Sequence, residues 1–210
     1  MKGERAGGAR DADSRLVPAR EGRGEVREKG SRFFGFARRA ASADAAEELV
    51  AKLRREHHDA THVAFAWKIG SSGDESLKFS DGGEPSGTAG RPIGAAIASS
   101  GLTDVAAAVV RYFGGTKLGT GGLARAYREA AELALRACGS LAVYDTVRIE
   151  TRPSHARVGA VRRLIDPPNV RLAAESFEPE PILELEVRRS VAEAVMKRLR
   201  DERIAARTTP

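Results

Sequence analysis

Two glycine-rich loops carry the residues with the clearest chemical potential. Residues 80–92 read Ser-Asp-Gly-Gly-Glu-Pro-Ser-Gly-Thr-Ala-Gly-Arg-Pro, and residues 114–122 read Gly-Gly-Thr-Lys-Leu-Gly-Thr-Gly-Gly. Glycine lets the backbone approach a ligand closely, and a helix that starts after such a loop presents free N–H groups that bind anions. Both loops are candidate anion-binding segments. The alternative is that their glycines only let two helices pack close to a sheet.

The second loop resembles a phosphate cradle, because a lysine, Lys117, lies inside it and arginines flank it. It is not a Walker A loop, since the position that must be lysine, counted from Gly114, is Thr120. The dinucleotide-binding pattern G-x-G-x-x-G also fails, because Ala124 occupies its last place. The loop therefore favours anion binding in general and identifies no nucleotide.

Asp81 and Glu84 are the two carboxylates of the first loop. Such a pair suits acid–base chemistry or a divalent cation. The alternative is that each carboxylate only caps the turns of its own loop. No serine–histidine–aspartate arrangement stands out, and we expect no catalytic residue.

Three histidines, His57, His58 and His62, raise the question of a metal. The run His58-Asp59-Ala60-Thr61-His62 imitates H-E-x-x-H, which needs both histidines on one helix face. Here Thr61 and His62 open a β-branched, aromatic segment, so the helix has ended before them. We therefore predict no metal and no cofactor, and expect His62 to be a strand residue hydrogen-bonded near the glycine-rich loops.

Composition limits the class of protein. The chain has 210 residues, of which 41% are apolar and 30% charged, as in globular proteins. No apolar run is long enough for a spanning helix or a signal peptide, and Cys138 is the only cysteine, which we expect in the core. These features predict a cytoplasmic protein without membrane association. The net charge of +6 is compatible with a polyanionic partner, although the excess of arginine over lysine is equally compatible with a bias in genome composition.

Hydrophobic periodicity predicts alternating strands and helices in the first part of the chain. Val105–Phe113 is an almost continuous apolar run and is typical of a strand buried on both faces. Residues 21–29 are charged and fit either a hairpin connection or an exposed strand. The predicted strands are 32–37, 61–69, 77–79 and 105–113, and the predicted helices are 43–55, 92–100 and 123–137.

A new pattern begins near residues 139–143. Strand, helix, strand, strand, helix and strand follow in that order, which is the ferredoxin-like pattern. We predict a disordered tail over 1–14, an N-terminal domain over 15–139 and a ferredoxin-like domain over 140–210. The segments of the second domain are strand 143–150, helix 154–165, strands 170–177 and 182–187, helix 190–200 and strand 204–207.

Taken together, the two loops resemble the YigZ/IMPACT family. The resemblance rests on Phe79-Ser80-Asp81, on residues 83–92 and 111–123, and on Arg125-Ala126-Tyr127. Ser31-Arg32-Phe33 fits the family's early strand, and Glu56-His57, Asp59-Ala60 and His62 fit its upstream element. The resemblance to the family covers residues 14–140. One departure is Gly82, where the family commonly has a second aspartate; a carboxylate cluster for catalysis or metal would lack that member.

The resemblance implies an α+β chain with two domains. The first would share the fold of a domain of a small-subunit ribosomal protein, a domain of elongation factor G and the galactokinase-type kinases. The second would resemble another elongation factor G domain. Eukaryotic relatives regulate a translation-control kinase pathway through protein contacts, and bacterial relatives are thought to bind nucleic acid or ribosomes. Some members carry a proline-dipeptidase label, for which this sequence offers no ligand set.

Three hypotheses follow. The first is a protein that binds RNA or the ribosome, and that could act as a translation regulator. The second is an enzyme that uses the glycine-rich loops, either for a phosphate-handling activity or as a hydrolase. The third is a pure protein-interaction module. Partner and oligomeric state stay open. The expected phosphate contacts are Arg91, Arg111, Lys117, Arg125 and Arg128. The expected shared cleft comprises His62, Asp81, Glu84, Ser86, Thr88, Gly114, Gly115, Gly119, Gly121 and Gly122.

Overall fold

The computed structural model describes residues 13–70 and 75–209. Most of the predicted disordered tail, residues 1–14, lies outside this part. Its last two residues contradict the prediction: Ser14 begins a strand and Asp13 is 5% exposed. Asp13 is ordered because its carboxylate accepts hydrogen bonds from the Arg188 guanidinium (2.6 Å) and the Ser190 N–H (2.9 Å).

The chain is a mixed α+β protein that divides into two compact units. One unit is Arg15–Val143, and the other combines Asp13 and Ser14 with residues 144–209. The two segments that run from one unit to the other, β1 (Ser14–Pro18) and β7 (Ser140–Tyr144), pair in a two-stranded sheet.

The larger unit is built on a five-stranded antiparallel sheet in the order β2-β3-β6-β4-β5. The central strand β6 is buried on both faces, which explains why its sequence is an unbroken apolar run. Residues 21–29, for which the sequence left two interpretations, contain the whole of the edge strand β2. The strands are β2 (Gly22–Glu28), β3 (Ser31–Arg39), β4 (His62–Ile69), β5 (Ser76–Ser80) and β6 (Val105–Tyr112).

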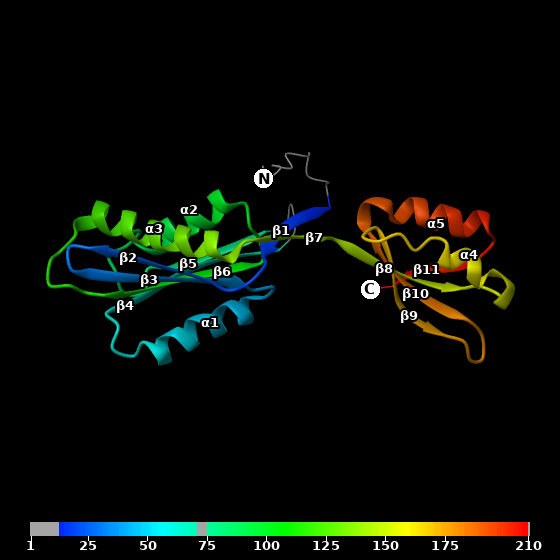
Figure 1. The fold of residues 1–210 in the computed structure, drawn as a ribbon, viewed down its shortest axis with the longest axis horizontal. Helices are drawn as coiled ribbons and strands as arrows, with labels where there is room; N and C mark the ends of the chain where they lie inside the picture. The colour runs from blue at the N-terminus through cyan, green and yellow to red at the C-terminus, as the bar shows by residue number, and fades with distance from the viewer. Residues whose placement is uncertain (1–12, 71–74, 210) are drawn as a thin grey trace, which may run out of the picture. The chain divides into compact units, whose positions relative to one another are not determined.

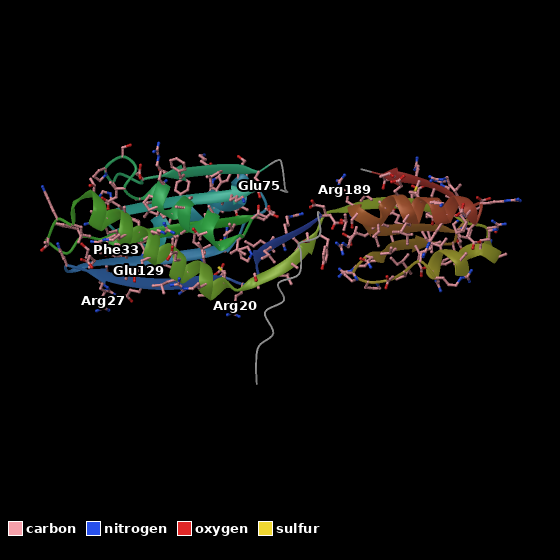
Figure 2. All side chains as sticks on the ribbon, turned by 90° about the horizontal axis from the view of Figure 1, so that it is seen from above. Arg20, Arg27, Phe33, Glu75, Glu129 and Arg189 are labelled. Carbon is pink, nitrogen blue, oxygen red and sulfur yellow. The ribbon has the colours of Figure 1, made fainter. Side chains whose placement is uncertain are left out.

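Helices cover both faces of this sheet. In Figure 1, α2 (Gly90–Ser100) and α3 (Gly119–Cys138) lie on one side and α1 (Ala43–Glu56) on the other. The alternation along β6 supplies both cores: Val109 faces α2 and α3, whereas Val110 faces α1. Phe33, labelled in Figure 2, is fully buried on the α3 side, where its ring meets Tyr127 edge-on at 5.1 Å.

Glycines on β2 and β3 let α3 lie unusually close to the sheet. A Cβ on Gly22 would stand 2.1 Å from the Ala134 carbonyl oxygen, and one on Gly35 would stand 2.1 Å from that of Ala130. Close helix–sheet packing was one interpretation of the glycine-rich loops. The glycines that serve this purpose along α3 lie on the strands instead.

The start of α3, which follows the second glycine-rich loop, differs from the boundary predicted from the sequence. Helix α3 begins at Gly119 and not at Leu123, so the second loop is only residues 113–118. Gly119 has φ +69°, a conformation that favours glycine and turns the chain into the helix. Gly121 and Gly122 therefore lie in the first helical turn. The end of α2 agrees with the sequence, since Gly101 adopts the left-handed conformation at its C-cap.

The smaller unit has the predicted order of strands and helices. Its four-stranded antiparallel sheet has the order β11-β8-β10-β9, and α4 and α5 lie on one side of it in Figure 1. The helix expected over 154–165 is shorter: a 3₁₀ turn at His155–Arg157 precedes α4. The bounds are β8 (Thr146–Arg152), α4 (Val158–Arg162), β9 (Val170–Ser176), β10 (Ile182–Arg188), α5 (Ala192–Asp201) and β11 (Ala205–Thr209).

This unit has a separate core, formed by residues such as Ile149, Leu185 and Leu199. In the described part of the chain, the structure contains no helix with the length and apolar character needed to cross a membrane.

Candidate functional site

Asp81 organises the first glycine-rich loop. Its Oδ1 accepts hydrogen bonds from the N–H groups of Ala89 (3.0 Å) and Gly90 (2.8 Å), and its Oδ2 accepts one from Gly87 (2.9 Å). Burial by itself would raise the pKa of Asp81, but these backbone donors outweigh it and hold the pKa below the ordinary value. Because Gly90 starts α2, Asp81 also caps that helix from a distance.

Glu84 turns inward from the same loop. Its side chain is only 3% exposed, and its Oε1 accepts hydrogen bonds from Arg111 Nη1 (2.6 Å) and the Tyr127 hydroxyl (2.8 Å). Burial, and then this hydrogen bond, raise the pKa of the Tyr127 phenol. Glu84 thus ties the first loop to the end of β6 and to α3.

Arg111 is held by more than its ion pair. Its guanidinium lies 5.4 Å from the Phe33 ring centroid and 5.5 Å from that of Phe113, and its Nη2 donates to Ser31 Oγ at 3.4 Å. The residue is 5% exposed. The sequence predicted a phosphate contact for Arg111; in the structure its charge is balanced by Glu84 and shielded from solvent, which does not favour that role.

His62 lies beside the same loop, as expected. Its Nδ1 is 3.2 Å from the carbonyl oxygen of Gly82, and its Nε2 is 3.9 Å from Glu84 Oε2. The apparent H-E-x-x-H run does straddle a helix-to-strand change, since α1 ends at Glu56 and β4 begins at His62. In the described residues, no three His, Cys, Asp or Glu side chains gather in a way that would hold a metal ion.

Gly82, the departure from the family pattern, has a conformational reason in this structure. It has φ +60°, and a Cβ there would stand 2.0 Å from the carbonyl oxygen of Val63. An aspartate at this position requires the loop to shift. Glycine in place of the family's second aspartate therefore allows the loop to pack directly on β4.

Among the remaining small residues of the predicted cleft, some make contacts within the protein and others have open space beside them. Thr88 is buried and donates its hydroxyl to the Pro85 carbonyl at 2.7 Å, whereas Ser86 is exposed. Gly114 packs against Gly30, and its N–H donates to Ser31 Oγ at 3.1 Å. By contrast, a Cβ on any of three glycines would meet nothing within 4 Å, so backbone there is open to a ligand: Gly115, Gly119 and Gly121.

The start of α3 is open in a second respect. Its N-cap residue is Leu118, no side chain of the described residues 13–70 and 75–209 forms a capping hydrogen bond with it, and its first turn contains no acidic residue. Within the described part of the chain, the first N–H groups of this 20-residue helix therefore have no side-chain acceptor. Four of the predicted phosphate-binding residues are exposed on this unit. One of them, Arg128, forms an ion pair with Glu132 at 2.8 Å. The other three are Arg91, Lys117 and Arg125.

Two contacts in this region were missed from the sequence. Tyr127 was placed on the apolar side of its helix, and its hydroxyl bond to Glu84 was not foreseen; a buried tyrosine does need a partner for its hydroxyl, so the signal existed. Ser31 contacts both Arg111 and Gly114 across 80 or more residues of chain, and nothing local indicates that. Cys138 is a core residue, as expected, and burial raises the pKa of its thiol to about 11.

The model of the Impact N-terminal domain matches residues 29–135. The chain belongs to the IMPACT family. An IMPACT family member of Haemophilus influenzae is 33% identical over 175 residues, which are 83% of this chain and 85% of the relative. IMPACT family member YigZ of Escherichia coli is 43% identical over 125 residues, 59% of this chain. The match spans 61% of that relative's length.

A solved structure, the crystal structure of a hypothetical protein, is similar over most of the chain. Its TM-score is 0.69 and its sequence is 29% identical, with 93% of this chain and 96% of that chain covered. The buried ion pair and both loops all fall inside the IMPACT match.

Proposed function

We propose that this IMPACT protein binds RNA, as a ribosome-associated factor or translation regulator, and that phosphates contact the open start of α3. The proposal includes the finer fold assignment: the larger unit is an IMPACT-type domain of the ribosomal-protein and elongation-factor-G kind, and the smaller unit is ferredoxin-like. Its strand order β11-β8-β10-β9 supports the latter. The domain limits 15–139 and 140–210 belong to the same proposal.

The uncapped, glycine-rich start of α3 carries the proposal. Helix N–H groups and the macrodipole favour an anion there, and the open glycines leave room for its approach. Lys117 precedes the helix and Arg125 lies on it, and both are exposed. A phosphate group can accept hydrogen bonds from the backbone N–H groups and form ion pairs with the nearby cations at the same time.

The enzyme hypothesis gains little support from the two carboxylates of the first loop. Asp81 uses both oxygens to hold backbone N–H groups, and Glu84 Oε1 is occupied by Arg111 and Tyr127. Three of the four carboxylate oxygens thus already accept hydrogen bonds from the protein itself. Because the carboxylates of Asp81 and Glu84 hold the first glycine-rich loop in place, the loop is better suited to be part of a rigid binding surface.

A second candidate function, protein binding, has one observation in its favour. The edge strand β5 exposes Leu77 (52%) and Phe79 (42%). Exposed edges with apolar side chains attract an added strand from a partner. Leu77→Glu would abolish such binding and leave RNA binding unchanged, which separates the two functions.

The test is RNA affinity measured by fluorescence anisotropy. We expect Lys117→Ala and Arg125→Ala each to weaken binding to a labelled single-stranded RNA, and the double variant to weaken it further, because each removes a phosphate contact. The matched control is Arg54→Ala with Arg55→Ala, which removes the same charge from the last turn of α1. Equal loss in both double variants would show that only net charge matters and would contradict the proposed site.

A further inference from the structure

The α1 side of the sheet is only partly covered. Helix α1 packs on β4 and β6 through residues such as Leu49, Val50 and Leu53. The end of β3 contacts the start of α1, where Arg38 Nη2 donates to the Ala45 carbonyl oxygen at 2.7 Å. Phe34 and Phe36, which β3 directs to this face, are nevertheless only half-buried. Phe34 and Phe36 stand on this face, while Phe33 and Gly35 point to α3.

Four rings form a continuous aromatic surface here. Phe34 stacks with His57 at 6.3 Å and an interplanar angle of 21°, and it meets Tyr112 edge-on at 5.9 Å. Phe36 lies 5.6 Å from His57. The Tyr112 hydroxyl is 2.9 Å from His57 Nδ1 and donates to Asp59 Oδ1 at 3.1 Å, so the polar edges of this surface are fixed.

Arginines lie over these rings. The Arg32 guanidinium carbon is 4.6 Å from the Phe34 centroid, and that of Arg23 is 5.7 Å from the Phe36 centroid. Arg23 and Phe36 are direct cross-strand partners. The acid between them, Glu25, is paired with Arg27 (2.9 Å) and Arg32 (3.3 Å), which leaves the strand pair with an excess of positive charge.

A hollow of about 490 Å³ opens at this place, large enough for a planar ring. Its lining combines the aromatic and charged side chains with the backbone of a glycine pair and the end of α1: Arg23, Gly24, Glu25, Phe34, Gly35, Phe36, Glu56 and His57.

The local sequence has a known counterpart in RNA recognition. The run Arg32-Phe33-Phe34-Gly35-Phe36 has the Arg-x-Phe-Gly-Phe spacing of the strand on which RNA-recognition domains stack bases. There, aromatic side chains of this strand stack bases; here Phe34 and Phe36 point to a sheet face that α1 covers only in part, and Gly35 faces α3. The five-stranded sheet of this unit is a different fold, so the similarity concerns the chemistry of one strand.

We propose that this aromatic surface, defined by Phe34, Phe36, His57 and Tyr112, stacks the bases of single-stranded RNA. The inference rests on the proposed function and adds a base-binding site to the phosphate site. The two are continuous along the chain, because Tyr112 ends β6 and the loop 113–118 with Lys117 follows directly. Bases stack on the rings, and Arg23 and Arg32 provide cation–π contacts and neutralise phosphates.

The experiment compares a labelled single-stranded RNA with a duplex of the same length. The wild-type protein should prefer the single strand, because paired bases are not free to stack. Phe34→Leu and Phe36→Leu keep an apolar side chain and remove the ring, and each should weaken single-strand binding about tenfold. Duplex binding and its salt dependence should stay unchanged. Phe177→Leu, an exposed phenylalanine of the smaller unit, is the matched control.

Arg23→Ala provides a variant that cannot disturb the core, since Arg23 is exposed on an edge strand. It should weaken single-strand binding and lower the salt slope. If both phenylalanine variants bind the single strand as the wild type does, while Lys117→Ala and Arg125→Ala weaken binding, the aromatic surface is not the base site and the phosphate site stands. If neither set of variants changes the affinity, both proposals fail.

Discussion

Glu84 shows how a residue that suggests catalysis from the sequence becomes structural in the fold. It stands in a loop of glycines beside another carboxylate, where an acid–base pair is a natural interpretation. In the structure its carboxylate is buried with the Arg111 guanidinium and the Tyr127 hydroxyl. A buried charge without a partner is very costly, so each member of this pair now depends on the other.

The Glu84→Gln variant tests this dependence. It leaves the Arg111 charge buried without its counter-ion, and we expect a loss of about 3 kcal/mol in the free energy of unfolding, measured by chemical denaturation. The exposed Glu129→Gln on α3 should change it by less than about 0.5 kcal/mol. The double variant Glu84→Leu, Arg111→Met should recover most of the stability. Full stability in Glu84→Gln alone would contradict a structural role.

At the scale of elements, the sequence predicted most strands and helices but misplaced the start of α3. Consecutive glycines predicted a loop through residue 122, because glycine disfavours helices. The helix nevertheless begins at Gly119, since Leu118 and Leu123 are partly and fully anchored in the core. The role of the glycines on β2 and β3 that face α3 was equally unpredictable, because the close approach of α3 to the sheet is a property of the tertiary structure.

A pair of glycine substitutions separates these two uses of glycine. Gly35→Ala places a methyl group against the Ala130 carbonyl, and we expect it to destabilise the protein by about 2 kcal/mol or more. Gly121→Ala meets open space inside a helix and should stabilise it by about 0.5 to 1 kcal/mol. Thermal unfolding of both variants measures the difference. The same sign for both substitutions would refute the assignment.

At the scale of the whole molecule, the sequence predicted an α+β chain with a change of pattern near residues 139–143. The structure divides the chain after Val143 and assigns Asp13 to the smaller unit. That assignment was not predictable, because Asp13 lies in a polar, glycine-rich stretch with no local pattern. Its partner Arg188 is 175 residues away and also lies over the Tyr144 ring at 3.9 Å.

This long-range pair predicts a dependence on pH. Hydrogen bonding to Arg188, opposed by burial, holds the pKa of Asp13 far below its ordinary value. A lowered pKa means that the stabilisation is fully present above about pH 4 and is lost as pH falls further. Asp13→Asn should therefore destabilise the smaller unit at pH 7 and flatten its acid response, followed by circular dichroism. Asp201→Asn, exposed on α5, is the control and should behave as the wild type.

The central claim is that phosphates bind at the start of α3, and the slope of log affinity against log salt concentration measures it most directly. On a single strand, each phosphate contact removed should lower the slope by about 0.7 unit. Lys117→Ala combined with Arg125→Ala should thus lose about 1.4 units on a 20-nucleotide single-stranded RNA, while Arg54→Ala combined with Arg55→Ala retains the wild-type slope. An unchanged slope in the first double variant, or an equal loss in both, would contradict the account.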